Sequence, residues 1–140
     1  MSRNVRLAVV LMFAVVVSAC GGNDTPTSPS VNVPFAITDI RVGTGAEATT
    51  GRNVTVAYVG WLYATSAAEN KGTQFDAGAF SFTVGTGVIA GFSRGVTGMR
   101  VGGQRRVVIP PDLGYGSAGS PPTIPGNATL IFDIELRSVQ

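Results

Sequence analysis

The chain has 140 residues, enough for one globular domain with its own hydrophobic core, and its 19 glycines and 8 prolines predict many turns. It has no histidine and only one cysteine, which excludes Cys/His zinc sites, Ser-His-Asp triads and cysteine-protease dyads. It also has no glycine-rich phosphate loop of the GxxxxGK(S/T) form, and no metal or cofactor is expected. The formal net charge is +2, but without Arg3 and Arg6 eight basic residues face eight acidic ones, so no nucleic-acid surface is expected.

The first nineteen residues have the pattern of a secretory signal peptide. Arg3 and Arg6 precede an apolar run, Leu7 to Val17, that is too short for a comfortable membrane span. The next residues, Val17-Ser18-Ala19-Cys20, resemble the lipobox of bacterial lipoproteins, in which the cysteine receives a lipid and becomes the new N-terminus. We therefore expect a lipoprotein signal peptide at 1–19, with lipidation of Cys20. A plain secretory signal and an uncleaved anchor are the alternatives.

Residues 20–34 form the expected tether. Gly21 to Pro34 is rich in Gly, Asn, Thr, Ser and Pro and has almost no large apolar side chain, so it cannot bury enough surface to order itself. With a lipid on Cys20, the following domain at 35–140 would be anchored in the cell envelope, on the periplasmic or extracellular face of a bacterial membrane. Nothing in the sequence argues for an oligomer, and we expect a monomer.

The first half of the domain predicts strands. Phe35 to Val42 ends at the turn signal Gly43-Thr44-Gly45, and Val54 to Leu62 alternates apolar and polar residues, which places Tyr58 toward the core. A buried tyrosine hydroxyl needs a hydrogen-bond partner. Ala64 to Thr73 predicts a surface loop, after which an aromatic stands beside a carboxylate at Phe75-Asp76 and a third strand is expected at Phe80 to Val84.

The second half predicts one helix and two strands. Val88 to Arg100 carries an apolar stripe at helical spacing, although each of its three glycines costs about 1 kcal/mol relative to alanine. Arg105 to Ile109 and Thr129 to Leu136 predict strands, the second with one wet face. The loop between them carries Tyr115 and an isolated Ile124, which suggests the edge of a pocket; the alternative is that Tyr115 is an ordinary loop aromatic. The economical arrangement is an α+β fold, with an antiparallel five-stranded sheet curled around one short helix.

Five ordered motifs resemble the FKBP-type peptidyl-prolyl cis-trans isomerases, and together they span about Phe35 to Val139. They are Tyr58-Val-Gly-Trp-Leu, Phe75-Asp76, Phe82-Thr-Val-Gly-Thr-Gly-Val-Ile-Ala-Gly-Phe92, Ile109-Pro-Pro-Asp-Leu-Gly-Tyr-Gly116, and Ile124-Pro-Gly-Asn-Ala-Thr-Leu-Ile-Phe-Asp-Ile-Glu-Leu136. The fold of that family, an antiparallel sheet around a short helix, agrees with the arrangement expected above.

The resemblance implies a pocket for the proline ring and its carbonyl. Its catalytic residues would be Tyr58, Phe75, Asp76, Ile89, Tyr115 and Phe132, and its further substrate contacts Phe80, Val88, Phe92 and Ile124. The Ile89 backbone N–H would bind the substrate chain, Phe92 would lie at the base of the pocket where many members have tryptophan, and Ile124 would close the far side. Trp61 is expected elsewhere on its strand.

Two departures from the family pattern affect this expectation. The loop between Leu62 and Phe75 is longer than in the smallest members, and the connection between Asp76 and Phe80 is shorter and lacks an arginine that often approaches the aspartate. The role of Asp76 therefore depends on the structure. Ser120 and Thr123 stand at positions on the edge of the pocket that are often larger or more apolar in the family, so the fit of macrolide inhibitors depends on the structure as well. The resemblance implies a prolyl isomerase that acts on proline-containing exported polypeptides; the alternative is a tethered chaperone or peptide-binding module of the same fold with little catalytic rate.

Overall fold

The computed structural model describes residues 33–140. The expected signal peptide and Cys20 lie outside these residues, as does the expected tether apart from its last two residues. Within the described range the order of elements is β1 (Ala36–Arg41), β2 (Asn53–Tyr63), β3 (Lys71–Thr83), α1 (Ala90–Val96), β4 (Gln104–Ile109) and β5 (Leu130–Val139). Two short 3-10 helices, Ala68–Asn70 and Pro111–Leu113, lie in the connections. None of the helices in 33–140 is long and apolar enough to cross a membrane.

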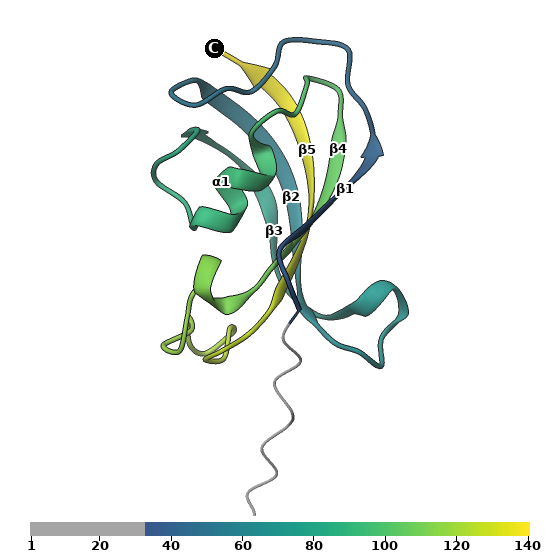
Figure 1. Cartoon of the computed structure of the whole chain (residues 1–140), viewed down its shortest axis with the longest axis vertical. Helices are drawn as coiled ribbons and strands as arrows, with labels where there is room; N and C mark the ends of the chain where they lie inside the picture. Colours follow the sequence, from purple (N-terminus) through teal and green to yellow (C-terminus); the bar gives the residue numbers. More distant parts are fainter. Residues whose placement is uncertain (1–32) are drawn as a thin grey trace, which may run out of the picture.

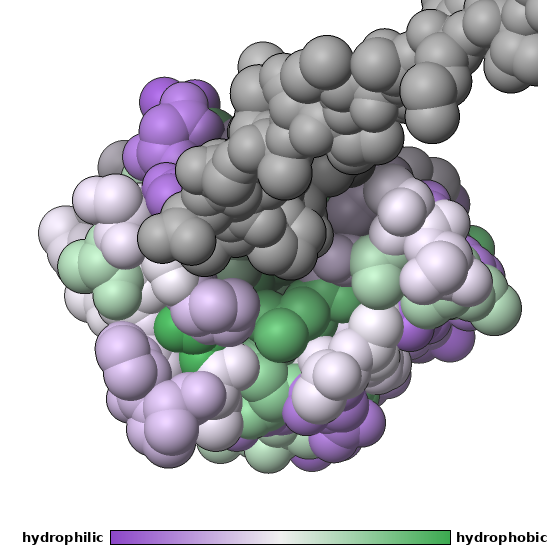
Figure 2. Space-filling model, turned by 90° about the horizontal axis from the view of Figure 1, so that it is seen from below, coloured by the Kyte–Doolittle hydropathy of each residue, from purple (hydrophilic) through white to green (hydrophobic). Residues whose placement is uncertain are grey.

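The five strands form one antiparallel sheet, as the sequence predicts, and the structure places them in the order β1-β4-β5-β2-β3. The sheet curls around α1, and the loop between β4 and β5 lies on the same side of the sheet as the helix (Figure 1). Viewed from below, strongly hydrophobic residues gather in the middle of the face (Figure 2). The sheet and the helix therefore enclose a single core on the concave side.

The core side of β5 has the predicted alternation. Leu130, Phe132, Ile134 and Leu136 are buried, and Asp133 and Glu135 on the opposite face are only partly buried. Ile131, on that opposite face, is also buried, at 1% exposure. Val54 and Val56 of β2 are fully buried beside β5, so the two central strands supply much of the apolar area that stabilises the fold.

The helix is shorter than the sequence pattern predicts. The pattern covers Val88 to Arg100, but α1 ends at Val96, because Thr97 has ψ 126° and Gly98 has φ +85°, neither of which continues a helix. Two of its glycines have a packing role: a Cβ on Gly95 would come within 2.5 Å of the Val107 side chain, and one on Gly91 would collide with Ile109. Glycine thus lets the helix lie against β4 at close range.

The predicted surface loop at Ala64 to Thr73 ends at Asn70, three residues earlier than expected, and the predicted connection between Asp76 and Phe80 is corrected. Strand β3 begins at Lys71 and runs without interruption to Thr83, paired with β2, so Phe75 and Asp76 belong to a strand. Small residues at 77–79 masked the apolar alternation on which the prediction relied. The residues between Asp76 and Phe80 are therefore part of the edge strand of the sheet.

The convex face of the sheet carries an ion-pair network. Arg106 donates two hydrogen bonds to Asp133, at 2.7 and 3.0 Å, and Lys71 donates a third at 2.9 Å. Burial alone would raise the pKa of Asp133, but the hydrogen bonds and charges of Arg106 and Lys71 together outweigh it and hold that pKa below its ordinary value. Glu69 accepts from Arg106 at 3.0 Å, which ties the β2–β3 connection to the sheet.

Candidate active site

The concave side of the sheet holds a cavity of about 170 Å³. Strands β2, β3 and β5, the segment leading into α1, the helix itself and the β4–β5 loop all contribute to its lining: Tyr58, Phe75, Asp76, Phe80, Gly87, Val88, Ile89, Phe92, Tyr115 and Phe132. Nine of the ten residues that the resemblance implies for the pocket thus lie together. The sequence reasoning missed Gly87, although it stands inside the Val-Gly-Thr-Gly-Val motif that carried the resemblance.

The tenth residue, Ile124, does not line the cavity. Its side chain is 4% exposed and packs within the hydrophobic core, and its backbone exchanges two hydrogen bonds with Ser120. Trp61 also lies away from the cavity, with the Lys71 ammonium 4.4 Å from the centre of its ring. Burial of Ile124 therefore holds the β4–β5 loop against the core, and the exposed Tyr115 is the residue of this loop that lines the cavity.

Aromatic rings form the base and walls of the cavity. Phe92 lies at the centre of the cluster, with its ring 5.1 Å from Phe132, 5.7 Å from Phe80 and 5.9 Å from Tyr58. Phe75 meets Phe132 edge-to-face at 5.5 Å. Such pairs add about 0.5–1.5 kcal/mol each beyond the area that they bury, so the shape of the cavity is well determined.

A glycine in β2 makes room for two of these rings. A Cβ on Gly60 would lie 2.7 Å from Phe75 Cζ and 2.8 Å from Phe132 Cε1, closer than carbon atoms approach. Gly60 pairs with Asp76 on one side and with Phe132 on the other. The missing side chain at position 60 is therefore what allows both rings to lie over the sheet at this point.

The one carboxylate of the cavity is bonded on both oxygens. Tyr58 donates its hydroxyl proton to Asp76 Oδ2 at 2.5 Å, and the Ala77 backbone N–H donates to Oδ1 at 2.9 Å. Burial, and then the hydrogen bond and the charge of Asp76, raise the pKa of Tyr58 to about 12. The hydroxyl that the sequence placed toward the core therefore has its hydrogen-bond partner.

The turn before α1 is held by a buried serine. The Gly85 N–H donates to Ser93 Oγ at 2.7 Å, and the Ile89 carbonyl accepts from the N–H groups of Phe92 and Ser93. In the described part of the chain no hydrogen bond uses the Ile89 N–H as donor. This donor at the mouth of the cavity is free to bind a ligand carbonyl.

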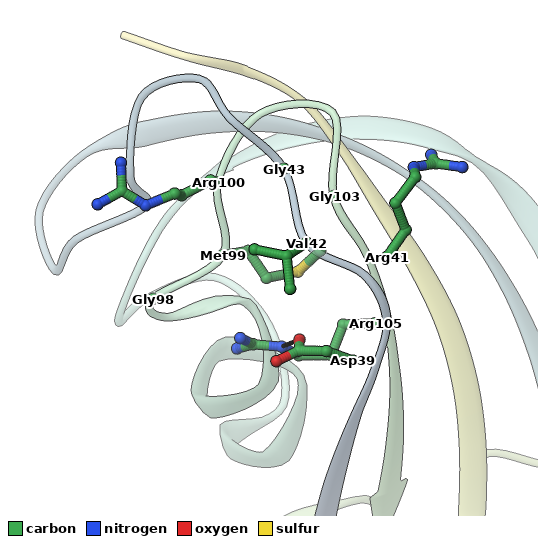
Figure 3. Close-up of a pocket in the computed structure, with 9 residues that line it drawn as sticks. All are labelled: Asp39, Arg41, Val42, Gly43, Gly98, Met99, Arg100, Gly103 and Arg105. Atoms are coloured by element: carbon green, nitrogen blue, oxygen red, sulfur yellow. Dashed lines mark hydrogen bonds and ion pairs between the residues drawn. The ribbon is translucent and has the colours of Figure 1, made fainter.

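A second cavity, of about 150 Å³, lies between the end of β1 and the segment after α1. Val42 and Met99 supply apolar parts of its lining, and Arg100 points outward (Figure 3). Arg105, which also lines this cavity, donates through Nε to Asp39 at 2.7 Å and through Nη1 to the carbonyls of Gly95 and Thr97 at 3.0 and 3.1 Å. These contacts close the C-terminal end of α1. In 33–140 no cluster of three or more His, Cys, Asp or Glu could hold a metal ion.

Comparisons with known proteins agree with this geometry. The family model described as FKBP-type peptidyl-prolyl cis-trans isomerase matches residues 45–137. FK506-binding protein 4 of Dictyostelium discoideum is 44% identical over 119 residues, which cover 81% of this chain and 31% of that protein. A FK506-binding protein of Neisseria meningitidis serogroup A is 43% identical over 109 residues, covering 74% of this chain and 94% of the relative. The Dictyostelium protein and two other similar relatives are much longer than the matched segment, so that the match covers only 25–31% of their length.

Solved structures give the same result. A peptidyl-prolyl cis-trans isomerase from Pseudomonas syringae superimposes with a TM-score of 0.66 at 31% identity, covering 76% of this chain and 75% of the other. FkpA from Escherichia coli superimposes with a TM-score of 0.65 at 35% identity, covering 76% of this chain and 48% of the other. The predicted fold class, a five-stranded antiparallel sheet around one helix, is confirmed by these structures.

Proposed function

The chain belongs to the FKBP-type peptidyl-prolyl cis-trans isomerases, and on that premise we propose that it accelerates rotation about X–Pro peptide bonds in the aromatic cavity. The observation that carries the proposal is the composition of the lining. Six aromatic rings and two aliphatic side chains surround a single carboxylate whose oxygens are already hydrogen-bonded. Such a site suits the proline ring and offers no nucleophile or strong base.

The reaction needs neither of these groups. The barrier to rotation is about 18–20 kcal/mol because amide resonance must be broken, and no bond to the enzyme forms. The twisted amide separates less charge than the planar one, so a water-poor apolar site favours it over the ground state. Phe75, Phe92 and Phe132 supply that environment, with Tyr58 and Phe80 completing the walls.

Hydrogen bonds would hold the substrate in register. The Ile89 N–H is available for a carbonyl of the substrate backbone, and the 40% exposed Tyr115 can present its hydroxyl from the loop. Asp76 positions Tyr58 by accepting its hydrogen bond and polarises the site, and the raised pKa of Tyr58 keeps the proton on the phenol. We assign no proton transfer to either residue.

We also propose that the protein works at a membrane on exported polypeptides. The lipobox-like Val17-Ser18-Ala19-Cys20 after an apolar run supports a lipid on Cys20, and the polar residues up to Pro34 support a flexible tether. Uncatalysed X–Pro isomerisation takes tens to hundreds of seconds, slow enough to limit folding after export. Retention of a radiolabelled fatty acid by the wild-type protein and its loss in Cys20→Ala test the anchor; equal labelling of both would contradict it.

Macrolide inhibitors are proposed to compete for the same cavity, since two relatives carry FK506-binding in their names.

The experiment that decides the isomerase function measures the isomerisation rate of a short Xaa-Pro peptide with the full chain in mild detergent. We expect acceleration that falls at least about tenfold in Asp76→Ala and Phe132→Ala, with Trp61→Phe as the control for an aromatic outside the cavity. A folded wild-type chain without acceleration would leave a peptide-binding module as the function.

A further inference from the structure

Strand β3 is an open edge of the sheet beside the cavity. It is last in the strand order and pairs only with β2. Residues 76–79 are all exposed, and the pairing runs without a register shift from Asn53 opposite Thr83 to Gly60 opposite Asp76. The other edge strand, β1, shifts register between Asp39 and Arg41. A bulge of that kind discourages pairing with another chain, and the stretch at 76–83 has no such protection.

Alternate residues of β3 direct their backbone N–H and C=O groups away from β2, toward the open side of the strand. The Ala77 N–H donates to the Asp76 carboxylate and so is directed away from β2. Residues of an antiparallel strand alternate in direction, and each directs its N–H and its C=O to the same side. The Ala77 carbonyl and both backbone groups of Ala79 are therefore available for pairing along the outer edge.

The cavity borders this edge at residues with small side chains. Phe75, Asp76 and Phe80 line the cavity on either side of residues 77–79. Between them stands Gly78, where a Cβ would meet nothing closer than the Tyr58 ring and hydroxyl at 3.9 Å. Ala77, Gly78 and Ala79 have side chains small enough to let a second backbone approach, and Asp76 is the only charged residue between Phe75 and Phe80.

We infer that residues flanking the proline of a substrate add to the sheet as a strand along the edge at Ala77–Ala79. This inference rests on the proposed isomerase function and extends it: the preferred substrate is an extended, unfolded polypeptide of several residues, bound by backbone hydrogen bonds that are independent of its sequence. An isomerase that serves many unfolded clients gains affinity in this way without selecting their side chains.

The test compares the catalytic efficiency, kcat/KM, of the full chain on two peptides with the same Xaa-Pro centre. One is a tetrapeptide, and the other has four polar residues added on each side. We expect the longer peptide to be isomerised at least about fivefold more efficiently. Replacing alternate amides by esters on one flank, which removes N–H donors, returns the ratio of the two efficiencies to about one. A ratio near one for the all-amide peptides, or no effect of esters on either flank, overturns the inference.

Two variants give the same test on the protein side. Ala79→Pro removes an outward N–H, and proline is tolerated at such edge positions, whereas Ala79→Ser retains it. We expect the ratio to fall to about one in the first and to persist in the second. Persistence of the ratio in Ala79→Pro refutes the edge pairing. Absence of acceleration on both peptides refutes the isomerase function instead.

Discussion

Gly60→Ala tests whether the pocket depends on one missing side chain. The new Cβ would lie 2.7 Å from Phe75 Cζ and 2.8 Å from Phe132 Cε1, so at least one ring must move. Overpacking of this kind costs about 1–3 kcal/mol, and the reduced entropy of the unfolded chain returns about 0.4–1 kcal/mol. We therefore expect a net loss of about 1–2 kcal/mol in the free energy of unfolding.

The assay is urea denaturation together with the peptide isomerisation rate. With a slope of about 1.5 kcal/mol/M, the urea midpoint should fall by about 1 M. A displacement of the rings by a few tenths of an ångström to 1 Å should lower kcat/KM by about tenfold or more. Gly78→Ala is the matched control for stability, because its Cβ has no neighbour closer than 3.9 Å. Wild-type stability and rate in Gly60→Ala would refute the reasoning.

Three further predictions follow from the hydrogen bonds. The pKa of Tyr58 is raised to about 12, so between pH 10 and 12 the folded state retains a proton that the unfolded state has lost. The free energy of unfolding should therefore fall as the pH rises from 10 to 12. An absorbance titration should show one tyrosine that ionises late, and this transition should disappear in Tyr58→Phe. The pKa of Asp133 is lowered in the folded protein. Its contribution to the free energy of unfolding is therefore complete above the ordinary aspartate pKa of 3.8 and is lost as the pH falls through the pKa of the folded state. Asp133→Asn should weaken the loss of stability at acid pH, and an unchanged acid dependence would contradict this. Arg105→Gln should lose about 2–3 kcal/mol in denaturant unfolding because the bonds to Asp39, Gly95 and Thr97 disappear, whereas Arg94→Gln on the exposed side of α1 should change stability by less than about 0.5 kcal/mol.

The sequence determined what local pattern encodes. The alternation at Leu130 to Leu136 fixes which face of β5 is buried, and the motifs around Tyr58, Phe75, Phe92 and Tyr115 identified the family and nine of the ten cavity residues that it implies. The absence of histidine limited the chemistry to a reaction that needs no strong base. These conclusions depend on the identity and spacing of neighbouring residues.

Tertiary structure decided the features that depend on contacts between distant segments. No local signal distinguishes Gly60 from any other strand glycine; only the approach of Phe75 and Phe132 gives it a role. Ala77-Gly78-Ala79 has too little hydrophobic pattern to predict a strand, and its pairing with β2 makes it one. Ile124 belongs to the core because the β4–β5 loop folds back on itself. In each case the energy that fixes the residue comes from packing and hydrogen bonds across the sheet, which a one-dimensional pattern does not contain.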